Sequence, residues 1–132
     1  AWIKQPRGLY QGKIKRTVFL SEQNPNSKDY SEEALREQAA GMAYAMKKLE
    51  ACDGIDAYQM HGWFDQRAEG GLRIGVRRFM DDETDPAWFV FQAFGTDRED
   101  EVFEFAKDII GIDDWDQVIY KAPIPMRPEL ND

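Results

Sequence analysis

Residues 16–61 decide the predicted fold, and they read RTVFLSEQNPNSKDYSEEALREQAAGMAYAMKKLEACDGIDAYQMH. Arg16–Ser21 is a short apolar run, with β-branched and aromatic residues and turn residues at its ends, which is typical of a buried parallel strand. Ile55–His61 is expected to form a second strand. Because a strand, a helix and a strand in this order make a βαβ unit, we expect the two strands to run parallel.

The segment between the two strands has the pattern of an amphipathic helix. Ser31 is a good N-cap, and two glutamates follow it in the first turn, where the helix dipole favours acidic side chains. Asp53-Gly54 ends the helix. One face is apolar, because apolar residues recur at spacings of 4, 3, 4 and 3, namely Leu35, Ala39, Met42, Met46 and Leu49.

A glycine-rich loop, residues 62–78, follows the second strand, and its glycines suit a turn that needs positive φ. Asp85-Pro86 then begins another helix, as N-cap and first helical residue. This helix is filled with aromatic side chains and ends at Gly95. We expect these aromatic side chains to need a large apolar partner.

A last helix is capped by Thr96 or Asp97, and Gly111 lies just beyond its end. Its buried side is expected to be Val102, Phe103, Ala106, Ile109 and Ile110. Asp113–Trp115 opens a final short turn or helix. These elements predict one domain in five segments: a loop over 1–15, the βαβ unit over 16–61, an active-face loop over 62–82, closing helices over 83–120, and a tail over 121–132.

Composition narrows the classes of function. The formal net charge of −8 disfavours nucleic-acid binding, because an acidic surface repels phosphate backbones. A neutral substrate such as a sugar is compatible with this charge. The single cysteine excludes an internal disulfide. No apolar run is long enough for a membrane span. We therefore expect neither nucleic acid nor a membrane span among the partners.

Two parallel strands alone would leave long unpaired edges, which natural domains avoid. The sequence therefore predicts that the sheet is completed by the remainder of the protein, as a missing N-terminal part or another chain. A small independent α/β interaction domain is the alternative.

Three pieces of the sequence together resemble a known family. They are residues 18–23, residues 38–44, and residues 55–61 continuing to 69–75. In this order they resemble the C-terminal third of an uncharacterised bacterial family of glycoside-hydrolase-like (β/α)8 TIM barrels, over roughly residues 16–120. The resemblance implies an α/β fold class, in which this chain supplies the C-terminal strand–helix units, about strands 7 and 8.

The same resemblance implies a catalytic role for Glu22. Retaining barrel glycosidases carry a nucleophilic Glu at the end of the seventh strand, and Glu22 matches that position. The acid/base would lie outside this chain, and the two carboxylates would stand about 5–5.5 Å apart. The alternative is that Glu22 is a solvated loop residue, or that it pairs with Arg16 or Arg36.

The candidate substrate-binding residues lie near the ends of the two predicted strands. His61, the only histidine, could hydrogen-bond a sugar hydroxyl or orient Glu22, or it could be structural. It lacks a second histidine as partner, so no metal site is expected. Trp63 could stack on a sugar ring or pack in the core. The set is completed by polar neighbours: Gln23, Asp65 and Glu69.

The sequence thus predicts a glycoside hydrolase-like protein that cleaves O-glycosidic bonds in an oligo- or polysaccharide. No cofactor is implied. A carbohydrate-binding barrel without turnover is the alternative within the same family. We expect a secreted or periplasmic bacterial protein, with a cytoplasmic place left open.

Overall fold

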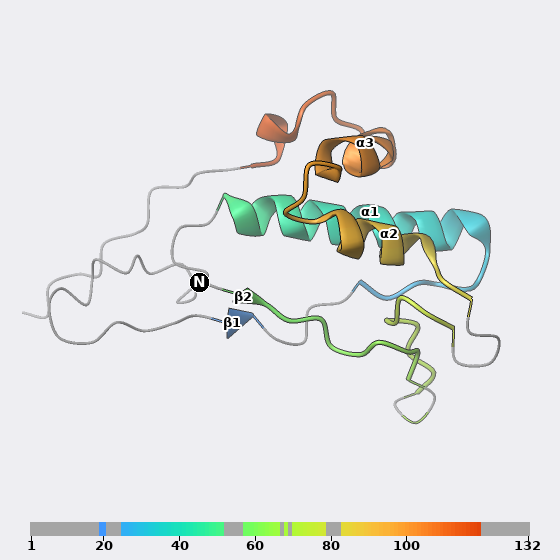
Figure 1. The fold of residues 1–132 in the computed structure, drawn as a ribbon. Helices are drawn as coiled ribbons and strands as arrows, with labels where there is room; N and C mark the ends of the chain where they lie inside the picture. Colours follow the sequence, from blue (N-terminus) through green and yellow to red (C-terminus); the bar gives the residue numbers. More distant parts are fainter. Residues whose placement is uncertain are drawn as a thin grey trace, which may run out of the picture.

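The computed structural model describes residues 19–20, 25–51, 57–66, 68, 70–78 and 83–119. Helices dominate this part of the chain (Figure 1). Its elements are β1 (Phe19–Leu20), α1 (Glu32–Glu50), β2 (Ala57–Tyr58), α2 (Pro86–Ala93), α3 (Glu99–Ile110) and the short 3-10 helix η3 (Trp115–Gln117). The predicted loop over 1–15 and tail over 121–132 lie outside the described residues.

Helix α1 confirms the strongest prediction from sequence. The Ser31 hydroxyl accepts a hydrogen bond from the Ala34 amide at 3.3 Å, so the predicted N-cap forms. Acidic residues occupy the first turn and lysines the last, as the helix dipole favours. The helix ends at Glu50, with Ala51 as its C-cap.

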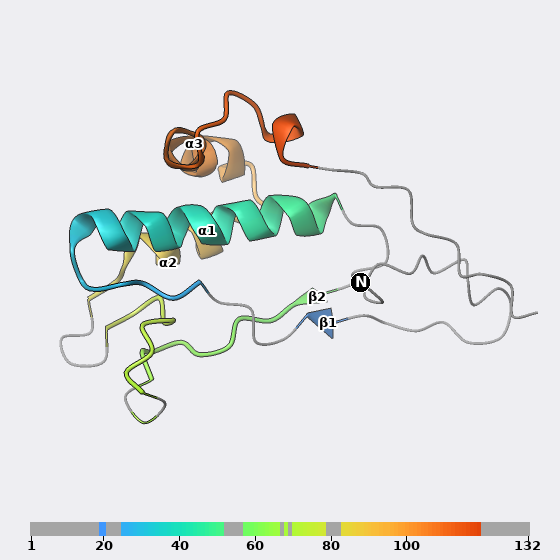
Figure 2. The same ribbon diagram turned by 180° about the vertical axis from the view of Figure 1, so that it is seen from behind.

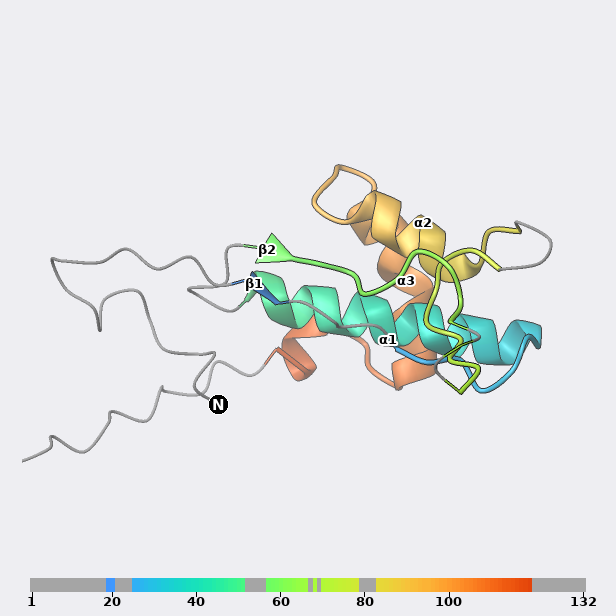
Figure 3. The same cartoon turned by 90° about the horizontal axis from the view of Figure 1, so that it is seen from below.

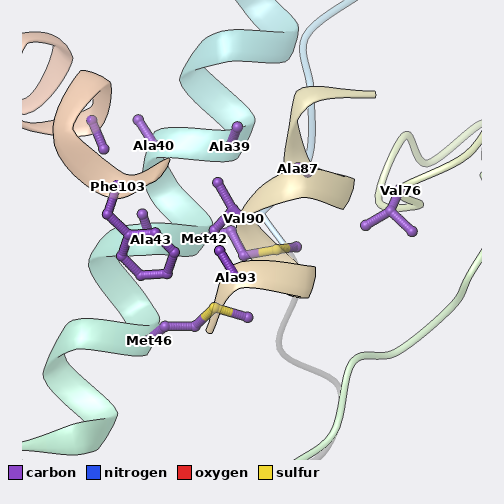
Figure 4. Packing of buried hydrophobic residues seen from close by; sticks show 11 residues of the cluster. Ala39, Ala40, Met42, Ala43, Met46, Val76, Ala87, Val90, Ala93 and Phe103 are labelled. Carbon is purple, nitrogen blue, oxygen red and sulfur yellow. The ribbon is translucent and has the colours of Figure 1, made fainter. Parts of the chain in front are cut away.

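Helices α2 and α3 both pack on α1, and each also contacts the other. Figure 1 shows α3 above α1 and α2 in front of it, and Figure 2 shows the same arrangement from behind. The cluster in Figure 4 combines small side chains with two methionines and one buried phenylalanine. Small side chains let the helices approach closely, and the methionines fill the irregular gaps between them. The core is therefore a helix-on-helix core.

Helix α2 turns its small side chains inward. Ala87, Val90 and Ala93 are buried, whereas Phe89 is 55% exposed. Trp88, Phe91 and Phe94 are partly buried and pack against the core. The helix begins at Pro86 as predicted, with Asp85 at the N-cap. The apolar partner of this aromatic helix is α1 of the same chain. No partner from outside the chain is needed to bury the inner face of α2.

Helix α3 ends as predicted but begins differently. Gly111 adopts the left-handed conformation at φ 80°, which a glycine reaches without steric cost. Arg98 is the N-cap, so the predicted cap at Thr96 or Asp97 is wrong. The Thr96 hydroxyl instead donates to the Ala93 carbonyl at 2.7 Å and accepts from the Arg98 amide at 3.2 Å. It therefore closes the turn between α2 and α3.

The buried side of α3 is narrower than the sequence predicts. Phe103 and Ala106 are buried, but Ile109 is 39% exposed. The short element expected from Asp113 onward is η3, where the Asp114 carboxylate accepts from the Asp116 amide at 2.8 Å.

The predicted α/β fold class, strand–helix units of a (β/α)8 barrel, is wrong for the described residues. Strand β1 pairs with β2 in parallel, with Phe19 opposite Ala57 and Leu20 opposite Tyr58, and each strand has only two residues (Figure 3). Residues 59–61, expected in the second strand, are not in a strand. The apolar face of α1 is buried by two helices, whereas a barrel helix would bury its face on the sheet. Short apolar runs do not by themselves distinguish a buried strand from other buried segments, which is why the prediction failed.

The loop that follows β2 is organised by isolated β-bridges, which join Phe64 to Arg77, Gln66 to Leu72, and Arg77 to Thr84. Gly70 and Gly71 form its turn at φ 75° and 76°, as the sequence predicts. In the views of Figures 1 and 3 this loop lies on the β-strand side of α1. Among the described residues no helix is both long and apolar enough to cross a membrane.

Candidate functional site

Three of the six predicted site residues lie in the described part of the chain. His61, Trp63 and Asp65 sit on the segment that leaves β2, drawn in green in Figure 1. Glu22, Gln23 and Glu69 lie outside the described residues. The geometry of the site is therefore built from the segment after β2 and from what contacts it.

Trp63 is held in place and is still accessible. Its ring makes perpendicular contacts with Trp88, at a centroid distance of 4.9 Å, and with Phe91, at 6.1 Å. Its carbonyl accepts from the amides of Val76 at 3.1 Å and Arg77 at 3.3 Å. Even so, the residue is 40% exposed. Edge-to-face contacts favour one ring orientation, so Trp63 is held in place while part of the residue stays accessible to solvent.

Asp65 braces the loop. It is only 7% exposed, and its Oδ1 accepts from the Gly75 amide at 3.0 Å while its Oδ2 accepts from the Tyr30 hydroxyl at 2.5 Å. Both oxygens thus bind protein groups, although a carboxylate can accept further hydrogen bonds. The bond to Asp65, together with burial, raises the pKa of Tyr30 above its usual value. Asp65 therefore ties the segment after β2 to the segment before α1.

Tyr30 is also the centre of an arginine cluster that the sequence analysis missed. The guanidinium carbons of Arg73 and Arg78 lie 5.2 Å and 5.4 Å from its ring centroid, within cation–π distance. Arg78 pairs with Glu83 at 3.0 Å and with Asp85 at 3.1 Å. Tyr30 lies more than 40 residues from Arg73 and Arg78 in the chain, so no spacing or motif signals their contact with its ring.

Gln38, a buried residue of α1, holds the loop that carries Arg73 against this helix. It is 3% exposed, and its Nε2 donates to the carbonyls of Arg73 at 2.8 Å and Pro25 at 3.0 Å. The Ser27 amide donates to the same Arg73 carbonyl at 2.9 Å. The bonds of the buried Nε2 favour one loop conformation because leaving that group unpaired would be costly, whereas the buried Oε1 of the same amide has no hydrogen-bond partner among the described residues. Gln38 therefore helps to set the position of the loop that carries Arg73.

His61 is half-buried and precedes Trp63 by two residues on the same segment. Within the part of the chain that the structure describes, no group of three or more His, Cys, Asp or Glu side chains could hold a metal ion. The described residues of this region offer a ligand aromatic rings, hydrogen-bonding groups and arginine guanidinium groups.

A second charged cluster joins the C-terminal end of α1 to the start of α3. Lys47 contacts Glu99 directly, and its Nζ lies 3.5 Å from Asp100 and 3.7 Å from Glu50. Glu99 also accepts from the Gly95 amide at 2.7 Å. The charges of this cluster pair with one another, which is typical of a structural role.

The three main members of this cluster titrate abnormally. Burial raises the pKa of Glu50, and the nearby Glu99 carboxylate raises it further. Burial acts in the same direction on Glu99, but hydrogen bonds from Lys47 and the Gly95 amide outweigh it and lower the pKa. Burial alone would lower the pKa of Lys47, but the bond to Glu99 and the surrounding carboxylates raise it.

A comparison with protein-family models matches residues 1–118 to a family described as a family of unknown function (DUF5722). This chain belongs to the DUF5722 family. The matched range includes every candidate site residue named above. No curated protein and no solved structure matches the chain. The description of DUF5722 carries no activity, so a function for this member must be argued from its own residues.

Proposed function

We propose that this DUF5722 protein acts on carbohydrate, with Trp63 as the surface on which a sugar ring stacks. The observation that carries the proposal is that Trp63 is 40% exposed yet held by two perpendicular aromatic contacts. Sugar-binding sites combine aromatic surfaces with a few polar groups. His61 lies two residues before Trp63, and the Tyr30 hydroxyl binds Asp65, two residues after it.

The proposed reaction is hydrolysis of O-glycosidic bonds in an oligo- or polysaccharide, with Glu22 as nucleophile. Glu22 and Gln23 follow the end of β1 by two and three residues, and His61 and Trp63 follow the end of β2 by three and five residues. Because β1 and β2 are parallel neighbours, the chain leaves both strands at the same edge, which supports a common site.

In the retaining mechanism the Glu22 carboxylate attacks the anomeric carbon and a glycosyl-enzyme forms, while a second carboxylate protonates the leaving oxygen. Water, activated by the same second carboxylate, then releases the sugar. That acid/base belongs to the remainder of the protein, outside this chain. We also propose a secreted or periplasmic place in a bacterium.

Binding without turnover is the second candidate, and one observation favours it. Asp65, the carboxylate nearest to Trp63 in sequence among the described residues, is buried, and both its oxygens already accept hydrogen bonds from the protein. It is therefore poorly placed to act as a catalytic acid or base. In this second candidate function the carbohydrate contacts Trp63 and His61 and is released without cleavage.

Two matched pairs of variants, made in the protein that also contains the proposed acid/base, test the proposal on a panel of glycans and aryl glycosides. Trp63→Ala should weaken glycan binding about tenfold or more, the equivalent of losing roughly 1.4 kcal/mol of contact, whereas Phe89→Ala, an exposed aromatic on α2, should not. Glu22→Gln should abolish hydrolysis and keep binding, while Glu32→Gln in the first turn of α1 should leave both hydrolysis and binding unchanged. Equal binding by Trp63→Ala and the unaltered protein would refute the carbohydrate site. Binding with no hydrolysis in the unaltered protein would establish the non-catalytic candidate.

A further inference from the structure

The protein uses only part of the hydrogen-bonding capacity of the Arg73 guanidinium group. Its Nη1 donates to the Lys28 carbonyl at 3.0 Å, and its guanidinium lies over the Tyr30 ring. Arginine has five N–H donors, so this arrangement leaves the Nε–Nη2 edge for a partner. Among the described residues no carboxylate lies within ion-pair distance of Arg73, in contrast to Arg78, which has two.

The position of Arg73 is set by several bonds that do not involve its charge. Its amide donates to the Asn26 side chain at 2.8 Å, and its carbonyl accepts from Gln38 and from the Ser27 amide. The side chain is then limited by Lys28 and by the Tyr30 ring. An arginine fixed in this way loses little conformational freedom when a ligand binds it, which favours affinity.

The neighbouring acids are already occupied. Asp65 binds Tyr30 and Gly75, and the Asp29 carboxylate accepts from the Ser31 amide at 2.8 Å. Asp85 and Glu83 face Arg78. Among the described residues no group therefore pairs with the Arg73 charge directly, so a carboxylate from outside meets a positive, hydrogen-bonding guanidinium.

The cluster is joined to Trp63 by a short physical path. Trp63 and Asp65 are two residues apart, so their Cα atoms are at most about 7 Å apart. Asp65 binds the Tyr30 hydroxyl, and Arg73 lies on the Tyr30 ring. These contacts connect Trp63, Tyr30 and Arg73 within one braced region, and we assign the next sugar of an oligosaccharide stacked on Trp63 to Tyr30 and Arg73.

We propose that Arg73, stacked on Tyr30, forms a second sugar position beside Trp63 and binds the carboxylate of a uronic acid residue. This inference rests on the proposed carbohydrate function and names its substrate class. A planar carboxylate matches the two parallel N–H groups of a guanidinium edge, and such bidentate bonds are among the strongest charge-assisted ones. The net charge of −8 acts against densely charged polyanions, but salt screens it beyond about 8–10 Å, so one close arginine decides the contact.

The test measures binding of the full chain to oligogalacturonate, to its fully methyl-esterified form, and to dextran sulfate. Esterification keeps the sugar rings and removes the charge. Tight binding is expected for oligogalacturonate only. Arg73→Gln should weaken it about 10- to 100-fold, the usual effect of losing hydrogen bonds to a charged group. Arg73→Lys keeps the charge without the planar edge and should lose most of the same affinity.

Arg36→Gln is the matched control, because Arg36 also stands over an aromatic ring, 5.6 Å from the centroid of Phe105, but lies on α1 away from this loop. It should bind oligogalacturonate as the unaltered protein does. Thermal unfolding of each variant checks that the fold is kept.

Three results would overturn the inference. The first is equal binding of oligogalacturonate and its ester, which leaves the proposed function standing if Trp63→Ala abolishes both. The second is equal or stronger binding of dextran sulfate, because charge alone would then explain the contact. The third is unchanged affinity in a folded Arg73→Gln protein. No binding to any glycan, neutral or acidic, would refute both the inference and the proposed function.

Discussion

The two sides of α1 use charged and aromatic residues in opposite ways. On the α3 side, Lys47, Glu50 and Glu99 neutralise one another, and the Phe103 ring beneath Lys47 is fully buried. On the loop side, a tryptophan and a tyrosine stay 40% and 45% exposed, although several hydrogen bonds hold the residues around them. A region built for stability satisfies its groups internally. The loop side is equally well braced but keeps groups available to a ligand, which is the pattern expected of a binding site.

The largest effect on stability is expected from a substitution in the core between α1 and α3. Phe103→Ala removes a ring that is 0% exposed and packs between α1 and η3, so it should lower the free energy of unfolding by about 3–5 kcal/mol. Phe89→Ala, on an exposed residue, should change it by less than about 0.5 kcal/mol. Urea unfolding followed by circular dichroism measures both values. Similar losses for the two variants would show that the helix-on-helix core does not carry the stability.

A smaller effect is expected from breaking the loop side. A Cβ at position 75 would lie 2.5 Å from the carbonyl carbon of Phe64, so Gly75→Ala must displace the backbone that carries Trp63 and Asp65. We expect a loss of about 1–3 kcal/mol together with loss of glycan binding, because overpacking forces backbone shifts. Gly41→Ala in α1 meets only Pro25 at 3.4 Å and should keep binding. Intact glycan binding in Gly75→Ala would argue against a rigid loop site.

The smallest expected effect is a pH dependence of stability that comes from the charged cluster on the α3 side. The pKa of Glu50 is raised in the folded protein, so its contribution to stability is complete below its ordinary pKa and is lost as the pH rises through the raised value. Glu99 has a lowered pKa, so its contribution is complete above its ordinary pKa and is lost as the pH falls through the lowered value.

Glu50→Gln imitates the protonated side chain. It should be slightly more stable than the unaltered protein at pH 7, and this advantage should vanish at acidic pH, where Glu50 itself is protonated. Thermal unfolding at pH values from about 3 to 8 measures the difference. Glu37→Gln, an exposed carboxylate on α1, is the control. A constant difference across the whole pH range would refute the role of Glu50 in this cluster.

The helices were largely predictable because their signals are local. The Ser31 cap, the acidic first turn and the apolar spacing of α1 all lie within one stretch of chain, and the start of α2 at Pro86 and the glycine at the end of α3 are equally local. The strand-based fold failed for the opposite reason. A sheet depends on distant partners, and short apolar runs do not by themselves say what will bury them.

The candidate site was predictable only in part. His61, Trp63 and Asp65 could be named from their place after an expected strand, but the buried, bracing role of Asp65 depends on Gly75 and Tyr30. Asp85 shows the same limit. It occupies the expected N-cap, yet no hydrogen bond from its side chain caps α2, and its carboxylate accepts from Arg78 at 3.1 Å.

By itself, the sequence determined the helices, the starts of α1 and α2, the glycine at the end of α3 and the glycine turn of the loop, because nearest-neighbour interactions along the chain decide these features. Only the tertiary structure decided that α1 is buried by α2 and α3, and that Arg73 and Arg78 meet on the Tyr30 ring. These contacts join segments that are distant in the chain, and their energy depends on burial and geometry that exist only once the helices have packed.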